Sequence, residues 1–562
     1  MTADITHDYA TPGTYTVNII GVFPYFKSCE IATGFSDCDN APKLSSIESW
    51  GDQEWRAMIG SFRSANNMII NTLQAPNLTF TTSLKETFRD ASSFNQPLDN
   101  WDVSKVTDMG GMFISATSLN QPLNNWDVSG VTTMYAMFNQ ATSFNQPLES
   151  WDVSQVTNMF TMFNGASSFD QPINDWDVSN VNNMASMFNE ATSFNQPLNS
   201  WDVSQVIDMN AMFYSATSFD QPLDSWDVSQ VTDMVYMFRD ATSFNQPLNS
   251  WDVSNVTNMG GMFEDASSFD QPLDNWNVSN VSNMRFMFES ASSFNQPLNN
   301  WDVSNVTDMN LMFNRASTFD QPLDNWDVSK VTDMGGMFIS ATSLNQPLNN
   351  WDVSGVTIMY AMFNQATSFN QPINDWDVSN VNNMASMFNE ATSFNQPLNS
   401  WDVSQVIDMN AMFYSATSFD QPLDSWDVSN VSNMEFMFSE AISFDQPLNN
   451  WDVSNVSDMR GMFESAESFN QPLDNWDVSR VTDMRFMFND ASSFNQDISM
   501  WCIEQIQVEP QGFADNSALQ NDFFPNWGAA CNLSTTNPDA IGFNILIYPN
   551  PSNSKVFIEN DG

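Results

Sequence analysis

The sequence predicts an α/β repeat fold, a right-handed solenoid in which each 25-residue unit contributes a short parallel strand and a short helical or 3-10 arm. Three observations predict it. Tryptophan recurs every 25 residues from Trp101 to Trp501, at seventeen positions and without an insertion. Within a unit, apolar residues follow first an alternating and then a helical spacing. A fixed period of this length indicates stacked units and not separate domains.

With Trp as position 1, a unit reads W-D-V-S-x-V-T-x-M-x-x-M-F-x-x-A-x-S-F-N-Q-P-L-x-x, as in residues 251–275 with few departures. We expect the strand at Leu98-x-x-Trp101-x-Val103, because apolar side chains alternate at its end. We expect the arm at 109–116, whose apolar residues are spaced i, i+3, i+4 and i+7. Stacked columns of Trp, Val, Met, Phe and Leu would then form the core.

The L-x-x-W-x-V segment also matches the L-x-x-L-x-L core of leucine-rich repeats. Over roughly residues 50–531, the chain resembles the BspA-like leucine-rich-repeat surface proteins, formerly grouped as a mycoplasma-type family of unknown function. The resemblance implies a surface protein, with adhesive or host-interaction roles in some members, and no enzyme.

Both ends resemble pieces of other modules. The run T-H-D-Y-A-T-P-G-T-Y-T-V at 6–17 resembles the last strands of a PKD-type β-sandwich. Residues 547–559 resemble the opening of the type IX secretion C-terminal sorting domain of Bacteroidetes. These resemblances imply a secreted or cell-surface (extracellular) protein of a Gram-negative bacterium of the Bacteroidetes type.

The expected organisation follows from these patterns, since the end units must differ from the inner ones. The expected segments are the end of a PKD-like sandwich (1–25), a disulfide-bearing connector (26–49), an N-terminal cap of degenerate repeats (50–100), sixteen repeats (101–500), a C-terminal cap (501–535), and a linker with the truncated start of a sorting domain (536–562).

The formal net charge is −52, with 67 acidic and 15 basic residues. Nucleic acid is therefore not an expected partner, because a phosphate backbone requires clustered Lys and Arg. No stretch approaches 18 uninterrupted apolar residues, so membrane insertion is not expected either. We expect a monomer.

Four cysteines fall in two pairs, Cys29 with Cys38 and Cys502 with Cys531. Three pairings are possible. We favour the two local disulfides, because the rod between the pairs would keep its ends apart. A zinc site is the alternative, but C-x-x-C spacing and a nearby His are both missing.

No enzyme and no cofactor are expected. His7 is the only histidine, and it lies in the PKD-like motif, so neither a Ser-His-Asp arrangement nor an H-E-x-x-H zinc site can be formed. A glycosidase-type carboxylate pair requires one distinctive environment, whereas a lattice repeats the same environment.

Position 2 forms an aspartate column that should point outward, because Trp101 and Val103 point inward. Carboxylates one strand apart repel by about 0.9 kcal/mol even in water. Local bonds from residues such as Ser104 would offset this. The alternative is a ladder of Ca²⁺ or another hard cation on Asp102, Asp127, Asp152, Asp177, Asp202, Asp227, Asp252, Asp302, Asp327, Asp352, Asp377, Asp402, Asp427, Asp452 and Asp477, with Asn277 as the exception.

Positions 10, 11, 14 and 15 vary among units, which indicates either relaxed constraint or a graded binding surface. No aromatic column recurs there, since Tyr135 is at position 10 and Tyr214 at position 14. The leading functional hypothesis is adhesion to, or interaction with, an extracellular protein or polysaccharide through many weak contacts. A passive stalk or surface-layer spacer is the alternative, and a secreted hydrolase is a distant one.

The array also contains copied blocks. Residues 96–146 recur at 321–371 with one change, Thr133 becoming Ile358, and residues 171–229 recur unchanged at 371–429. Such copying is tolerated where each unit contacts only its neighbours. It argues against a single dedicated active site.

Overall fold

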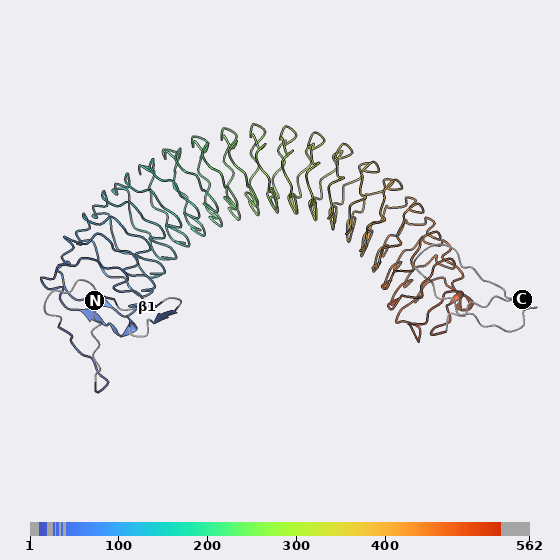
Figure 1. Ribbon diagram of the computed structural model, residues 1–562, viewed down its shortest axis with the longest axis horizontal. Coiled ribbons are helices and arrows are strands. Elements are labelled where there is room, and N and C mark those ends of the chain that lie inside the picture. Colours follow the sequence, from blue (N-terminus) through green and yellow to red (C-terminus); the bar gives the residue numbers. More distant parts are fainter. Residues whose placement is uncertain (1–9, 19–25, 28–29, 33–34, 38–40, 530–562) are drawn as a thin grey trace, which may run out of the picture.

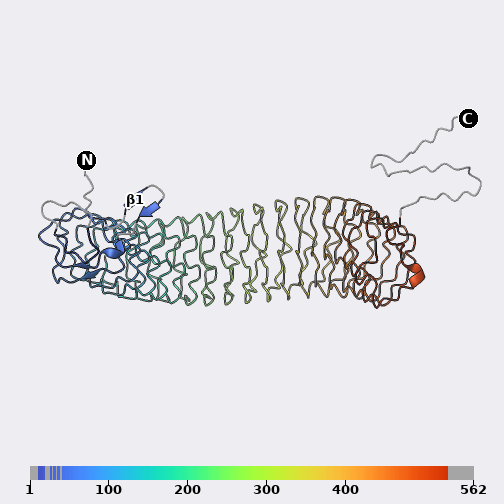
Figure 2. The same cartoon turned by 90° about the horizontal axis from the view of Figure 1, so that it is seen from below.

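In the computed structural model, 25-residue units stack side by side into a long arc (Figure 1). The structure describes residues 10–18, 26–27, 30–32, 35–37 and 41–529. Viewed from below, the units follow one another as a row of similar turns (Figure 2). The solenoid predicted from the 25-residue period is therefore present.

Backbone hydrogen bonds join neighbouring units along one segment, residues 107–115 of the first full unit. There the N–H groups of residues 109, 111, 113 and 115 each donate to a carbonyl 24 residues later, at 2.7–3.1 Å. Parallel bridges repeat at position 8 in every unit, from Ser83 to Asp483. The segment expected to be an arm is thus the ladder that holds the units in register.

The helical arm is a wrong prediction, because this segment is a series of turns. The N–H of Met112 donates to the Met109 carbonyl at 3.2 Å, and that of Ala116 donates to Phe113 at 3.0 Å. Positions 11 and 15 have positive φ, 62° at Gly111 and 55° at Ser115. A helix needs negative φ throughout, whereas a type II turn requires a positive value at its third residue.

The strand expected at Leu98-x-x-Trp101-x-Val103 is also wrong, because no strand is assigned there. Tryptophan rings of successive units are 6.2–6.5 Å apart, which exceeds the roughly 4.8 Å between paired strands. Side chains bridge the wider gap instead. The Trp126 Nε1–H donates at 2.9 Å to the carbonyl of Leu98, three residues before the preceding tryptophan, and this bond recurs along the array.

The spacing of the buried rings explains the curvature. Successive Phe rings at position 13, on the ladder, are 5.5–5.7 Å apart. The spacing rises to 5.9–6.1 Å at position 19 and is largest in the tryptophan column. Because the shorter spacing must lie on the inside of an arc, the ladder lines its concave side. We call the ladder's outward positions 8, 10, 11, 14 and 15 the inner face.

The core is continuous from Trp50 to Leu519, and its Met and Phe columns are fully buried. Asn and Asp side chains at position 20 form a polar column that links neighbouring units where the chain turns. The Asn145 Oδ1 accepts the Asp170 N–H at 3.0 Å and the Gln171 Nε2–H at 2.8 Å, and the pattern repeats. These bonds satisfy backbone N–H groups where the chain turns.

At the N-terminal end, strand β3 (Ser46–Ile47) pairs in parallel with β4 (Ile69–Ile70). Phe26 and Leu44 pack against the core. Part of the expected connector 26–49 thus contributes to the stack. This region also contains β1 (Glu30–Ala32), β2 (Phe35–Asp37), which pairs with it in antiparallel orientation, and the 3-10 helix η1 (Ala41–Lys43).

At the C-terminal end, the ladder continues from the last full unit into the cap, since the Phe488 N–H donates to the Phe513 carbonyl at 2.7 Å. The 3-10 helix η2 (Asn521–Phe523) follows. In the described part of the chain, no helix is long and apolar enough to cross a membrane.

Some sequence predictions concern residues outside the described ranges. They are His7, Cys29, Cys38, Cys531 and the sorting-domain resemblance at 547–559. Residues 10–18 are described and contain no assigned strand. The PKD and sorting resemblances stay predictions.

Candidate functional site

The variable positions of the repeat lie on the inner face. In each unit the Met and Phe side chains of the ladder point into the core, while residues at positions 10, 11, 14 and 15 point the other way and are mostly half-buried. Among the large hydrophobic side chains at these positions, Phe160 is the most exposed, at 42%. The concave side is therefore where units differ in chemistry.

Aromatic residues and arginine gather on this face. All five tyrosines of residues 101–500 occupy positions 10, 11 or 14, and five of the six arginines occupy positions 10, 14 or 15. The two lysines, Lys105 and Lys330, are at position 5 instead. Tyrosine, phenylalanine and arginine are enriched in protein interfaces and lysine is depleted.

Several inner-face rings lie over a glycine of the neighbouring unit. A Cβ at Gly261 would be 2.4 Å from the Tyr236 ring, and a Cβ at Gly110 would be 2.2 Å from the Tyr135 ring. Positive φ does not explain Gly261, because Ala211 has a φ of 51° at the same position. The glycine is there because the ring occupies the space of a side chain.

Arginine side chains lie over several inner-face rings. The Arg239 Cζ is 5.3 Å from the Tyr214 ring centroid and 5.1 Å from that of Tyr236. The Arg285 Cζ is 4.4 Å from the ring of Phe286. Such cation–π contacts hold both groups flat on the surface.

No single variable position carries an aromatic column, since the tyrosines are distributed over positions 10, 11 and 14. In the structure, positions 10, 11 and 14 share one face, so their rings form one discontinuous surface. The pairing of an aromatic residue with a glycine one unit away, as at Tyr236 and Gly261, was the sequence signal that could have found it.

An unusual acidic group lies in this surface. Glu264 is 7% exposed, its Oε1 accepts from Arg239 Nη2 at 3.0 Å, and its Oε2 has no partner. Burial raises the pKa of Glu264 to about 7, although Arg239 acts in the opposite direction. Burial also raises the pKa of Glu289, whose carboxylate accepts from Asn314 at 2.7 Å. The ion pair thus offsets only part of the cost of burying this charge.

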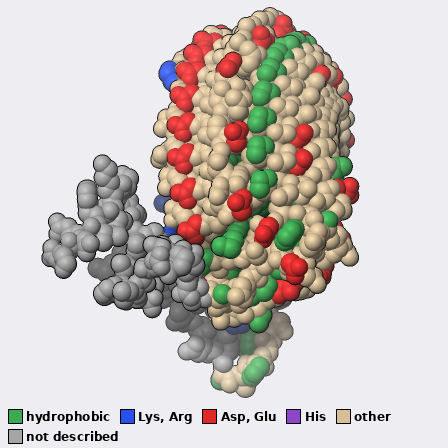
Figure 3. All heavy atoms as spheres, turned by 90° about the vertical axis from the view of Figure 1, so that its right-hand side faces the viewer, with side chains coloured by type: hydrophobic (Ala, Val, Ile, Leu, Met, Phe, Trp, Pro, Cys, Tyr) green, Lys and Arg blue, Asp and Glu red, His purple; other side chains and the backbone are tan. Residues whose placement is uncertain are grey.

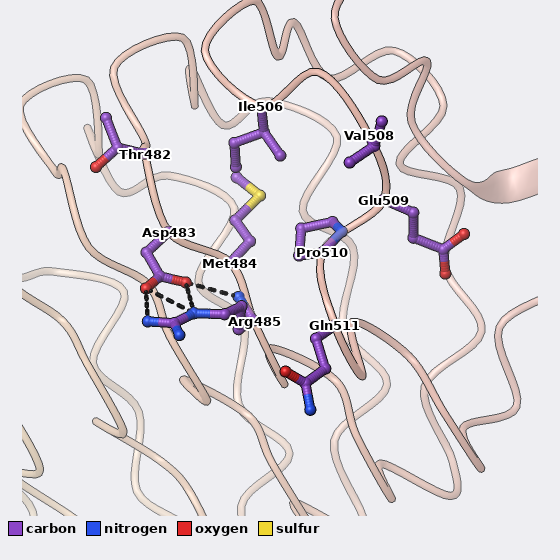
Figure 4. A pocket seen from close by; sticks show the side chains of 9 residues that line it. All are labelled: Thr482, Asp483, Met484, Arg485, Ile506, Val508, Glu509, Pro510 and Gln511. Atoms are coloured by element: carbon purple, nitrogen blue, oxygen red, sulfur yellow. Dashed lines mark hydrogen bonds and ion pairs between the residues drawn. The ribbon is translucent and has the colours of Figure 1, made fainter.

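An open hollow of about 310 Å³ lies where the last full unit meets the C-terminal cap, beside Arg485, Ile506 and Val508 (Figure 4). Its Arg485 side chain turns back to Asp483 instead of pointing into open space. A broad surface, and not a deep cleft, is what the array offers a partner.

The aspartate column of position 2 is exposed and lies away from the ladder. Rows of acidic side chains follow the arc on the side seen in Figure 3. The Asp127 Oδ1 accepts the Ser129 N–H at 3.1 Å and the Ser129 hydroxyl at 2.6 Å. The hydroxyl bond is the main reason why the pKa of Asp127 lies below its usual value.

The same backbone bond forms where the carboxylate is missing, since the Asn277 Oδ1 accepts the Ser279 N–H at 3.2 Å. This supports the local explanation of the column, in which the residue caps a turn. Among the described residues, no group of three or more His, Cys, Asp or Glu side chains is arranged to hold a metal ion. The cation ladder stays a prediction.

Cys502 is the only cysteine that the structure describes, and it is disulfide-bonded. The three cysteines available to it lie outside the described residues, so the local pairing stays a prediction.

The family model described as "Mycoplasma protein of unknown function, DUF285" matches residues 56–169, 141–250, 218–326, 312–426 and 414–527. The chain belongs to this family. The match confirms the repeat family expected from the 25-residue unit, and the DUF285 description assigns no activity. No curated protein matches the chain.

Solved structures similar to this DUF285 chain include leucine-rich-repeat proteins. One from Bacteroides ovatus is 10% identical, covers 84% of this chain and 92% of its own, and has a TM-score of 0.25. An internalin from Listeria monocytogenes is 10% identical, covers 56% and 83%, and has a TM-score of 0.18. These likenesses assign no partner to the chain.

The substitution Gly261→Ala tests the ring contact. We expect it to lower the free energy of unfolding by about 1–3 kcal/mol more than Gly60→Ala, because the new methyl group overpacks against Tyr236. Gly60 is the matched control, with a φ of +61° and nothing within 4 Å of its Cβ position. Urea denaturation measures both variants, and equal losses would refute the contact.

Glu264→Gln tests the buried carboxylate. Because the pKa of Glu264 rises from 4.5 to about 7 on folding, the folded state retains a proton that the unfolded state releases between these values. Stability should therefore fall as pH rises from 4.5 to 7. At pH 8 we expect the Gln variant to be more stable by about 1–3 kcal/mol, with no difference below pH 4.5. A less stable variant at pH 8 would mean that the Arg239 ion pair outweighs burial.

Chelation tests the aspartate column. Since Ser N–H groups already engage these carboxylates, we expect the thermal midpoint in excess EDTA to equal that in Ca²⁺-containing buffer. A lower midpoint in EDTA that added Ca²⁺ restores would instead establish the cation ladder.

Proposed function

We propose that the chain is a non-enzymatic interaction protein whose inner face binds a protein partner with a basic surface. The observation that carries this proposal is the segregation of tyrosine and arginine onto one side of the arc. These are the residue types that dominate binding energy at protein interfaces. They occur where the units differ, on a surface held rigid by the backbone ladder.

Charge supports a basic partner. Positions 8, 10, 14 and 15 of residues 101–500 carry 18 acidic residues and five arginines. Arg239 and Arg460 are already engaged by Glu264 and Glu435, which leaves the face strongly negative. Complementary charge on a partner accelerates encounter and selects against acidic competitors.

We further propose that the chain acts outside the cell, secreted or at the surface of a bacterium of the Bacteroidetes type, in adhesion. The disulfide at Cys502 supports this, because disulfides persist in oxidising compartments. The resemblance of residues 547–559 to a sorting domain points the same way.

A charge-matched pair of variants tests the proposed function. Inner-face substitutions Glu190→Gln, Asp240→Asn and Asp265→Asn remove three charges, and outer-side substitutions Asp202→Asn, Asp227→Asn and Asp252→Asn remove the same number. The parent is first screened against purified extracellular matrix proteins and a glycan array. We expect binding to basic proteins, weakened at least tenfold by the inner set and less than twofold by the outer set.

Equal effects of the two sets would contradict an inner-face site. Binding to glycans without any protein would contradict the proposed partner class. The absence of binding to any protein or glycan tested would favour the spacer role.

A further inference from the structure

Two regions of the inner face, 200 residues or eight units apart, carry the same constellation. Residues 171–229 recur unchanged at 371–429, so Tyr214 and Tyr414 are identical copies. Beyond the copied block, residues 230–290 and 430–490 differ at many variable positions. What the two regions still share is therefore informative.

Both regions retain an aromatic ring that lies over a glycine. Tyr236 in one region corresponds to Phe436 in the other, and each lies over a glycine of the next unit. A Cβ at Gly261 would be 2.4 Å from the first ring, and a Cβ at Gly461 would be 2.3 Å from the second. An acid also follows each glycine by three residues, Glu264 and Glu464.

The cation over the ring is retained by a different residue. Arg239 lies 5.1 Å from the Tyr236 ring, but the equivalent position in the second region is Ser439. Arg460 replaces it from the next unit, at a position equivalent to Gly260, and lies 5.2 Å from the Phe436 ring. An ion pair holds each guanidinium, at 3.0 Å to Glu264 and at 3.3 Å to Glu435.

Simple copying does not produce this result. The sequence has changed at both arginine positions, yet each region keeps a ring over a glycine, a cation over that ring and an acidic residue three positions after the glycine. The ion pairs differ, because Arg239 bonds to Glu264 whereas Arg460 bonds to Glu435 and not to Glu464. Aromatic, arginine and carboxylate groups in one compact patch form the kind of anchor that dominates protein interfaces. The surroundings are also alike, since acidic residues outnumber arginines around both patches.

We propose that the inner face carries two equivalent docking stations for basic peptide segments, so that one chain binds two identical partner modules. Station A is defined as Tyr214, Tyr236, Arg239 and Glu264, and station B as Tyr414, Phe436, Arg460 and Glu464. Eight strand spacings separate them by roughly 40 Å along the arc. This inference rests on the proposed inner-face function and adds the number of sites and their residues. A partner with two basic segments would gain avidity from both.

Single-station variants test the proposal. The probe is a fluorescently labelled peptide of six Arg-Gly repeats, with six Glu-Gly repeats as its charge control. The variants are Tyr236→Ala, Phe436→Ala and their combination, and alanine fits this position because Ala136 and Ala361 occupy it in other units. Phe160→Ala is the matched control, since Phe160 is exposed and belongs to neither station.

Calorimetric titration of the full chain should give two equal sites for the Arg-Gly peptide. Each single variant should give one site with unchanged Kd, the double variant none, and Phe160→Ala two. Two copies of the peptide joined by a flexible linker of about 60 residues, which spans roughly 40 Å, should bind the parent at least tenfold more tightly than either single variant.

The stations would be overturned if the parent bound one peptide, or if either single variant still bound two. The charge-matched test would be unaffected by that result and could still support the inner face. Binding at many sites that none of the variants changes, or no saturable binding, would overturn the stations as well. If the charge-matched sets also have equal effects, the proposed function fails with them.

Discussion

Backbone hydrogen bonds between neighbouring units are concentrated on one side of the stack, and the rest of the structure depends on this constraint. The ladder at 107–115 sets a short spacing there. On the other side, tryptophan rings and their Nε1–H bonds keep the units further apart. A stack held at two different spacings must bend, and the ladder then lines the concave side.

The same constraint shapes the candidate site. Side chains on the inner face repeat at the ladder spacing, and a ring that extends across the neighbouring unit leaves no room for a side chain beneath it. Rings therefore lie over a neighbouring glycine, as Tyr135 does over Gly110. Arginine and acidic residues lie between these rings on the inner face, and burial there raises the pKa of Glu264. Inner-face side chains thus vary from unit to unit on a backbone whose conformation repeats.

The period, the buried columns and the altered end units could be predicted from the sequence, because each follows from apolar spacing. The type of element could not. Spacing at Met109, Met112 and Phe113 suits both a helix and a turn ladder that buries one side, and only the positive φ at Ser115 separates them. Leu98, Trp101 and Val103 alternate as in a strand, but bulky indoles force those segments too far apart to pair.

The binding surface was predicted only in part. Variable positions could be located, but their common face depends on turns that the periodicity does not reveal. Cations over rings, such as Arg460 over Phe436, join residues 24 positions apart and have no local signature. The aspartate column was found from its regularity, and the bonds at Asp127 and Asn277 show that turn capping suffices to explain it.

Hydrogen–deuterium exchange by unit tests the central claim most directly. Peptides that contain residues 276–277 or 286–289 are unique in sequence, so their exchange can be assigned without ambiguity. The one-sided ladder predicts slow exchange at 284–291, where every second N–H bonds to the next unit, and faster exchange at 276–280. Slow exchange at 273–278 with fast exchange at 284–291 would place the ladder at the tryptophan segment and contradict the account.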